Sequence, residues 1–246
     1  MPRFRSYCPS LAVEGEIFQL DAFESRHLVA TNRARAGDEV IAFDGKGLEC
    51  TCRIVEADRR NSRLRKLTCG KLVRMGTKIT LAQAVTKGKT MDSIVRRATE
   101  LGVFRIQPLI SQRIQVRLNN LPRKSDKWKQ QCIEACKQSG NGWIPQLSAP
   151  VPLQHFLVSL DFDLTLLASL RGRITPWQNL DPGPATCALI IGPEGDFSTE
   201  EYKLLRNSGA VGVSLGRHVL RSETAAVSAL ALANQFLGYQ TKSPPA

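Results

Sequence analysis

The sequence predicts an α/β protein in which a smaller β-rich module precedes a mostly parallel sheet. Two apolar runs, at residues 188–191 and 211–215, each lead into a glycine-bearing loop and then into a helix with a polar start. Alternating polar and apolar residues near the N-terminus predict the β-rich module. The two C-terminal loops should lie side by side at one edge of the sheet, where ligands of α/β proteins usually bind.

The first predicted domain covers residues 1–72 and consists mainly of strands. Residues 38–43 alternate and run into Asp-Gly-Lys-Gly at 44–47, which is a hairpin signal, and residues 48–55 return as the second strand. Residues 63–68 supply a further strand. These segments predict a small antiparallel sheet.

The second predicted domain covers residues 75–240 and alternates strands with helices after a linker at 74–77. Strands are expected at 79–85, 104–110, 164–168, 188–191 and 211–215, and helices at 91–101, 125–139, 153–160, 198–209 and 223–237. Ser198 and Glu201 have the spacing of a capping box. The last helix is apolar nearly all round, which predicts burial or a subunit interface. Residues 241–246 are expected to form a disordered tail.

The excess of positive charge is concentrated in the middle of the chain. The 34 Lys and Arg residues exceed the 22 Asp and Glu residues by 12. Residues 74–137 hold 14 basic and 4 acidic residues, a net charge of +10, whereas residues 1–73 carry +3 and residues 138–246 carry −1. Such a region is typical of a face that binds a polyanion, and equally of a solvated surface.

Cysteine usage and hydropathy predict a cytoplasmic protein with no metal site. Seven cysteines at irregular spacing fit reduced thiols better than a disulfide framework. Cys132 and Cys136 lack the further ligands that a cluster needs, and Cys50 and Cys52 share one face of a strand, so core packing is expected for all four. No apolar run approaches the roughly 18 residues of a membrane helix, and no signal peptide is recognisable.

Two motifs in the C-terminal part carry a resemblance to a known family. They are Gly192-Pro193-Glu194-Gly195 and Leu215-Gly216-x-x-x-Leu220-Arg221-x-Glu223-Thr224-Ala225. As a pair at this spacing they resemble the uridine-N3 methyltransferases of 16S ribosomal RNA (RsmE-type) in the SPOUT superfamily. Further matches lie at 27–28, 37–38, 100–103 and 138–140. The resemblance implies a trefoil-knotted SPOUT methyltransferase domain after a PUA-like β-barrel, although general topology rules alone disfavour a knot.

The resemblance implies S-adenosylmethionine as the cofactor, bound by the loops that follow Ala168, Ile191 and Leu215. Glycines in these loops would let the backbone approach the cofactor closely, although glycine is also an ordinary turn residue. The residues expected to bind the cofactor are Ala168, Ile191, Gly192, Pro193, Glu194, Gly195, Leu215, Gly216, Leu220, Thr224 and Ala225.

Methyl transfer to N3 of uracil requires removal of a proton, because this nitrogen is protonated at neutral pH. The site therefore needs a base and a group that stabilises negative charge. Arg221 is the candidate for stabilising charge on the uracil oxygens, and Glu194 and Glu223 are the alternatives for the base. The structural alternatives are that Arg221 pins its loop and that Glu223 only favours the first turn of its helix.

The expected partners are 16S ribosomal RNA in the small subunit and a second copy of the chain. Candidate phosphate contacts are Arg3, Arg5, Arg33 and Arg35 in the first domain and Lys87, Lys89 and Arg113 in the second. For the four arginines of the first domain, the alternative is that each is ordinary surface charge of a small barrel.

Several positions depart from the family pattern. Asp196 replaces a usual glycine, and Arg217-His218 stands where Pro-Arg is common. Asn141, Gln112 and Thr31-Asn32 also differ from the usual residues. Two alternatives therefore stay open: a non-catalytic rRNA-binding or ribosome-assembly factor with this fold, and a SPOUT methyltransferase with another RNA target.

Overall fold

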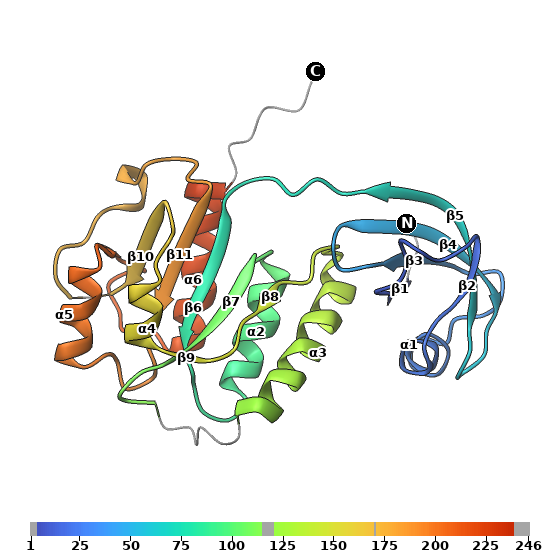
Figure 1. Ribbon diagram of the computed structural model, residues 1–246, viewed down its shortest axis with the longest axis horizontal. Helices are drawn as coiled ribbons and strands as arrows, with labels where there is room; N and C mark the ends of the chain where they lie inside the picture. Colours follow the sequence, from blue (N-terminus) through green and yellow to red (C-terminus); the bar gives the residue numbers. More distant parts are fainter. Residues whose placement is uncertain (1–3, 115–120, 170, 239–246) are drawn as a thin grey trace. The chain divides into compact units, whose positions relative to one another are not determined.

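The computed structural model describes residues 4–114, 121–169 and 171–238, so Arg3 and the predicted tail at 241–246 lie outside the described residues (Figure 1). The chain divides into two compact units. The N-terminal unit comprises Met1–Arg74 and Ile133–Ile144, and the C-terminal unit comprises Met75–Cys132 and Pro145–Ala246. The predicted domain boundaries, 1–72 and 75–240, stay a proposal.

The N-terminal unit is built on a curled five-stranded sheet with the order β1-β3-β4-β5-β2. The strands are β1 (Phe4–Tyr7), β2 (Ile17–Gln19), β3 (Glu39–Phe43), β4 (Leu48–Glu56) and β5 (Arg63–Lys71). β1 runs parallel to β3, and the other neighbours are antiparallel. The predicted hairpin of β3 and β4 is confirmed. Asp44 closes it, because its Oδ1 accepts hydrogen bonds from the amides of Lys46 (2.6 Å) and Leu48 (3.0 Å).

Two further segments complete the N-terminal unit. α1 (Ala22–Arg26) is capped by Asp21, whose side chain accepts from the Glu24 amide, and continues as the π-helical turn η1 (His27–Thr31). The segment at 133–144 joins the hairpin tip through hydrogen bonds from the Gly47 amide to the Gly142 carbonyl (3.2 Å) and from the Ile144 amide to the Gly45 carbonyl (3.0 Å). The alternating strand residues and Leu28 form the core under this sheet.

The expectation that all cysteines are reduced is wrong for one pair. Cys50 and Cys69 face each other on the antiparallel strands β4 and β5, with their Cα atoms 4.0 Å apart, and form a disulfide. Spacing along the chain does not reveal this pairing, because the register of the two strands brings the residues together. The expected core packing of Cys52, Cys132 and Cys136 is confirmed, since all three are buried. Burial raises the pKa of the Cys132 thiol to about 11.

The C-terminal unit contains a seven-stranded parallel sheet with the order β12-β10-β11-β6-β7-β8, in which β9 also pairs with β7. Its strands are β6 (Lys78–Ala84), β7 (Arg105–Ile110), β8 (Gln146–Leu147), β9 (Val151–Pro152), β10 (Leu164–Ala168), β11 (Thr186–Ile191) and β12 (Val211–Val213). β6 and β11 are nearly continuous apolar runs, as expected for strands that are covered on both faces. The predicted parallel sheet is confirmed.

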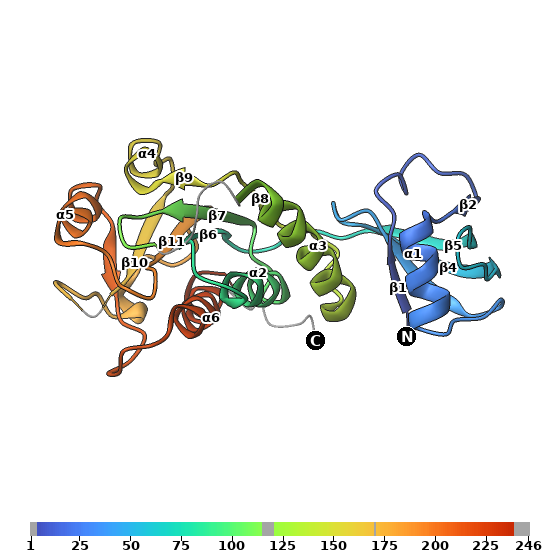
Figure 2. The same cartoon turned by 90° about the horizontal axis from the view of Figure 1, so that it is seen from below.

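Helices cover both faces of this sheet. They are α2 (Thr90–Glu100), α3 (Leu121–Ser139), α4 (Leu153–Val158), α5 (Thr199–Asn207) and α6 (Ser222–Ala233), with short helical turns at Trp177–Asn179 (η3) and Asn234–Gly238 (η4). Figure 2 shows α2 and α6 on one face and α4 and α5 on the other. The capping box of Ser198 and Glu201 is confirmed at the start of α5.

The helix boundaries differ from expectation at two places. α3 begins at Leu121, four residues earlier than predicted, and a proline at the second position is compatible with a first helical turn. α6 begins at Ser222, and its last turn changes to a π-helix at Asn234. Within the described ranges, no helix is long and apolar enough to cross a membrane.

We expect Cys69→Ser to lower the free energy of unfolding by about 3 kcal/mol under oxidising conditions, because the disulfide closes a loop with a sequence separation of 19. Urea unfolding measures this difference. The matched control is the unsubstituted protein with its disulfide reduced, whose stability should fall to that of the variant. Equal stability of the oxidised protein and the variant would contradict the prediction.

Candidate cofactor and catalytic site

The register of the parallel sheet brings the predicted cofactor loops together. β10 lies between β12 and β11, with Ala168 opposite Val213, and Ile191 at the end of β11 lies opposite Gln83 of β6. The chain therefore leaves β10, β11 and β12 at the same carboxyl edge of the sheet. This edge is where parallel α/β sheets bind ligands.

A hydrogen-bonded clamp joins the ends of β6 and β11 to the start of α6. The side chain of Gln83 is fully buried, and its Nε2 donates to Ser222 Oγ (3.0 Å) and to the Gly192 carbonyl (3.4 Å). Ser222 Oγ in turn donates to the Gly192 carbonyl (2.7 Å). Arg221 occupies the N-cap position of this helix, and the hydroxyl of Ser222, in the first turn, takes part in the clamp.

The same edge contains buried polar atoms that have no partner among the described residues. They are Gln83 Oε1, the Thr86 hydroxyl after β6 and the Ser111 hydroxyl after β7. Buried polar atoms are normally hydrogen-bonded, so unpaired ones are compatible with a polar ligand. S-adenosylmethionine, which carries amino, carboxylate, hydroxyl and adenine groups, fits an edge of this chemistry.

Arg113 and Glu194 fix the loop after β11. Arg113 Nη1 donates to the Gly195 carbonyl (3.0 Å) and the Phe197 carbonyl (3.4 Å). The Glu194 carboxylate accepts from the Lys87 amide (3.1 Å), which ties this loop to the one after β6. Both the candidate base Glu194 and the candidate RNA contact Arg113 therefore hold the loop in place.

Asp196 has a backbone conformation that glycine adopts readily. Its φ is +60°, in the left-handed region that glycine adopts without strain and that aspartate tolerates better than most residues. The Asp196 carboxylate compensates by accepting from the Phe197 amide (2.8 Å) and the Tyr202 hydroxyl (2.7 Å), and it lies 3.6 Å from Arg171. Burial raises the pKa of Tyr202, so its hydroxyl stays protonated as the donor.

The second motif forms the loop from β12 into α6. Gly216 has a φ of +129°, which only glycine adopts readily, and its amide donates to Ser214 Oγ (3.2 Å). Arg221 is exposed at the helix start, and its carbonyl accepts from the Ala225 amide (2.8 Å). Glu223 lies in the first turn and is half-buried. Leu215 and Leu220 are half-buried in the loop, and Thr224 is exposed in the same turn.

The candidate RNA contacts occupy different environments. Lys87, Lys89 and Arg35 are exposed. Arg33 is exposed and has a φ of +59°. Arg5 is largely buried, with its guanidinium paired to Glu49 and 5.0 Å from the centre of the Phe43 ring. These contacts remain predictions.

Comparison with known proteins identifies the chain. An RNA methyltransferase domain matches residues 74–234, and an RNA methyltransferase PUA domain matches residues 20–67. The ribosomal RNA small subunit methyltransferase E of Aquifex aeolicus is 34% identical over 205 residues, which cover 81% of this chain and 86% of the relative. The chain belongs to the ribosomal RNA small subunit methyltransferase E family. The family member from Synechocystis is 30% identical over 237 residues, covering 93% of this chain and 76% of the relative.

Solved structures agree with this family assignment. A putative methyltransferase from Legionella pneumophila, solved with bound SAM, superposes with a TM-score of 0.90 at 33% identity and covers 97% of this chain and 100% of its own. The family member from Neisseria gonorrhoeae, bound to S-adenosyl methionine, gives a TM-score of 0.86 at 26% identity, with 96% and 98% of the two chains covered. The expected fold class, a SPOUT-type domain preceded by a PUA-like module, is confirmed.

Gln83 and Tyr202 belong to this site, although no sequence motif marks either residue. Gln83 is the one long polar side chain in the otherwise apolar run at 79–85. A long polar residue in a buried strand could have indicated a role in this site. The sequence gives no comparable indication for Tyr202, because its hydrogen bond to Asp196 forms only through the conformation of the turn. Among the described residues, no group of three or more His, Cys, Asp or Glu side chains could hold a metal ion.

We expect Asp196→Ala to be less stable than Asp196→Gly by about 1 kcal/mol. Both variants lose the hydrogen bonds to the Phe197 amide and the Tyr202 hydroxyl, so they differ mainly in the cost of a left-handed backbone. Urea unfolding of the two purified variants measures the difference. Equal free energies of unfolding would show that the backbone conformation at residue 196 carries no strain.

Proposed function

We propose that this protein is an S-adenosylmethionine-dependent methyltransferase that methylates N3 of a uridine in 16S ribosomal RNA of the small subunit. The observation that carries the proposal is that both family motifs leave the same edge of one parallel sheet, where Gln83 and Ser222 join them. Family membership supports the reaction class, and the SAM-bound relatives support the cofactor.

The cofactor would lie against the loops after Ala168, Ile191 and Leu215. When bound, S-adenosylmethionine supplies an electrophilic methyl group. The chain must orient the uracil and take the proton from N3. Arg221 is suited to stabilise the negative charge that develops on the uracil oxygens, because it is an exposed cation at this edge. Glu194 already accepts from the Lys87 amide, which favours Glu223 as the proton acceptor.

The departure at Asp196 does not support a non-catalytic factor. Aspartate keeps the left-handed turn that glycine would adopt, and its carboxylate adds bonds that fix the loop. Arg221 and Glu223 are both retained at the start of α6. An intact loop geometry together with these two side chains favours catalysis over binding alone.

The proposed active form is a cytoplasmic homodimer. α6 packs its buried residues Ala226, Ala229, Leu230 and Ala233 against its own unit. Ala231 and Phe236, on α6 and the turn after it, are nevertheless exposed. Apolar side chains of this kind suit a contact with a second copy of the chain.

We expect the purified protein to transfer a labelled methyl group from S-adenosylmethionine to small ribosomal subunits that lack the modification. Nucleoside mass spectrometry of the product should find N3-methyluridine at one site. Heat-inactivated protein is the control. A methylated ribose or a methylated transfer RNA would contradict the proposed target, and cofactor binding without any transfer would favour the non-catalytic alternative.

We expect Arg221→Ala to bind S-adenosylhomocysteine with an unchanged Kd and to lose about 10²–10³-fold in single-turnover rate, because it removes a group that stabilises developing charge. Arg97→Ala, which changes an exposed arginine in the last turn of α2, is the matched control and should react at the normal rate. An unchanged rate for Arg221→Ala would exclude this side chain from the chemistry.

A further inference from the structure

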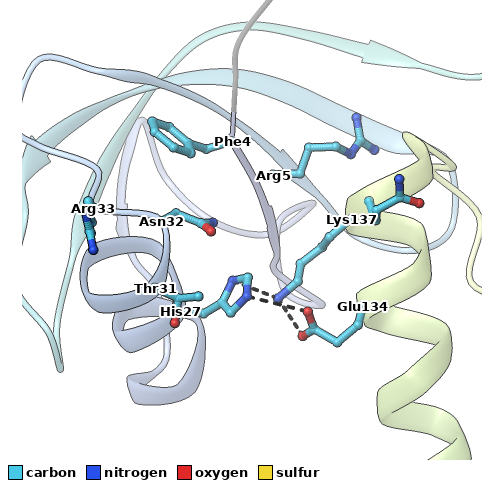
Figure 3. Close-up of a pocket in the computed structure, with 9 residues that line it drawn as sticks. Phe4, Arg5, His27, Thr31, Asn32, Arg33, Glu134 and Lys137 are labelled. Atoms are coloured by element: carbon cyan, nitrogen blue, oxygen red, sulfur yellow. Dashed lines mark hydrogen bonds and ion pairs between the residues drawn. The ribbon is translucent and has the colours of Figure 1, made fainter.

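A cavity of about 620 Å³ opens in the N-terminal unit, and every residue that lines it belongs to that unit (Figure 3). Its walls come from β1, from η1 with the residues just after it, and from the last turns of α3. Cavities that bind small molecules typically measure roughly 300–1,000 Å³. The volume is therefore sufficient for one nucleotide.

The floor of the cavity is a buried ion cluster. Lys137 is almost fully buried, and its Nζ donates to Glu24 Oε1 (2.9 Å) and lies 2.7 Å from Glu134 Oε1. Nζ also lies 3.3 Å from His27 Nδ1, as Figure 3 shows. Because an ammonium can only donate, Nδ1 acts as the acceptor and the ring proton is on Nε2, which lies 3.6 Å from Glu134 Oε2. Two carboxylates therefore surround the one ammonium, so the floor carries no positive charge that is available to an anion.

The second cation of the cavity is also neutralised. Arg5 pairs with Glu49, and its side chain is only 11% exposed. Arg33, by contrast, is exposed and forms no ion pair with any residue that the structure describes. Positive charge available to an anion is therefore located at Arg33, and the floor offers hydrogen-bonding groups without net positive charge.

The remaining walls suit a nucleobase. Asn32 and Gln138 line the cavity with amide groups, which both donate and accept hydrogen bonds. Phe4 supplies an aromatic ring, and proteins that bind unpaired RNA commonly stack bases on such rings. A π-helical turn, which η1 forms here, is frequent at functional sites.

We propose that this cavity binds one unpaired nucleotide of the RNA, with the base among Phe4, Asn32 and Gln138 and a phosphate at Arg33. The proposal rests on the proposed function, because it takes RNA as the substrate. A site for a bare anion fits less well, since Lys137 and Arg5 are already paired with carboxylates. A neutral base with one attached phosphate matches a floor without net positive charge and a single available cation at Arg33.

The test is an NMR titration of the full-length protein with uridine 5′-monophosphate and, separately, with ribose 5-phosphate. We expect the nucleotide to shift the backbone amide signals of Asn32, Arg33 and Gln138. Ribose 5-phosphate should bind at least about 10-fold more weakly because it lacks the base.

Gln138→Trp should weaken nucleotide binding by a similar factor, because the indole fills the cavity from an exposed helical position. Arg33→Gly removes the charge, suits a φ of +59° and should weaken binding several-fold.

Arg59→Ala is the matched control, because Arg59 is an exposed arginine of the same unit that does not line the cavity. Its nucleotide affinity should equal that of the unsubstituted protein.

With small ribosomal subunits, Gln138→Trp should raise KM and leave kcat nearly unchanged. Equal affinity for ribose 5-phosphate and the nucleotide, or normal nucleotide binding by Gln138→Trp, would overturn the proposal. An error in the proposed function would give a different result from an error in the cavity proposal. The unsubstituted protein would then bind the nucleotide but transfer no methyl group.

Discussion

The contacts of Gln83 with Ser222 and the Gly192 carbonyl determine how the loops are arranged at the carboxyl edge of the parallel sheet. They connect the ends of β6 and β11 to the first turn of α6, so both family motifs are fixed to one point. Gln83 is fully buried, and in such surroundings a hydrogen bond is strong and an unpaired polar group is costly. The position of Arg221, the residue just before Ser222, follows from this clamp.

The sequence was sufficient to predict most of the elements around this site. Apolar runs such as 188–191 identify buried strands because both faces of a parallel sheet are covered. The capping box at Ser198 is a local interaction and was therefore readable. Asp196 could be recognised as a departure, but its meaning required the backbone angle, since a φ of +60° lies in the region that glycine adopts without strain and that aspartate tolerates.

The sequence did not predict contacts between residues that lie far apart along the chain. Cys50 and Cys69 pair only because of the register between β4 and β5. Lys137 meets Glu24 across a separation of 113 residues, and neither residue belongs to a motif. Pairings of this kind depend on the tertiary arrangement, so periodicity and spacing along the chain carry no information about them.

The charge of +10 in residues 74–137 shows why composition alone is a poor measure of an RNA-binding surface. Lys137 is buried between two glutamates, Lys127 pairs with Asp92, and Arg113 holds the carbonyls of Gly195 and Phe197. Charges used in this way contribute little to the attraction of phosphates, because that attraction depends on the charge that is not already neutralised. Exposed cations such as Lys87 and Lys89 beside the cofactor loops, and Arg33 in the N-terminal unit, are better placed to contact RNA than the total charge would suggest. A small number of positioned cations, combined with sites for individual bases, would give the protein selectivity for one RNA site that a uniformly basic surface would lack.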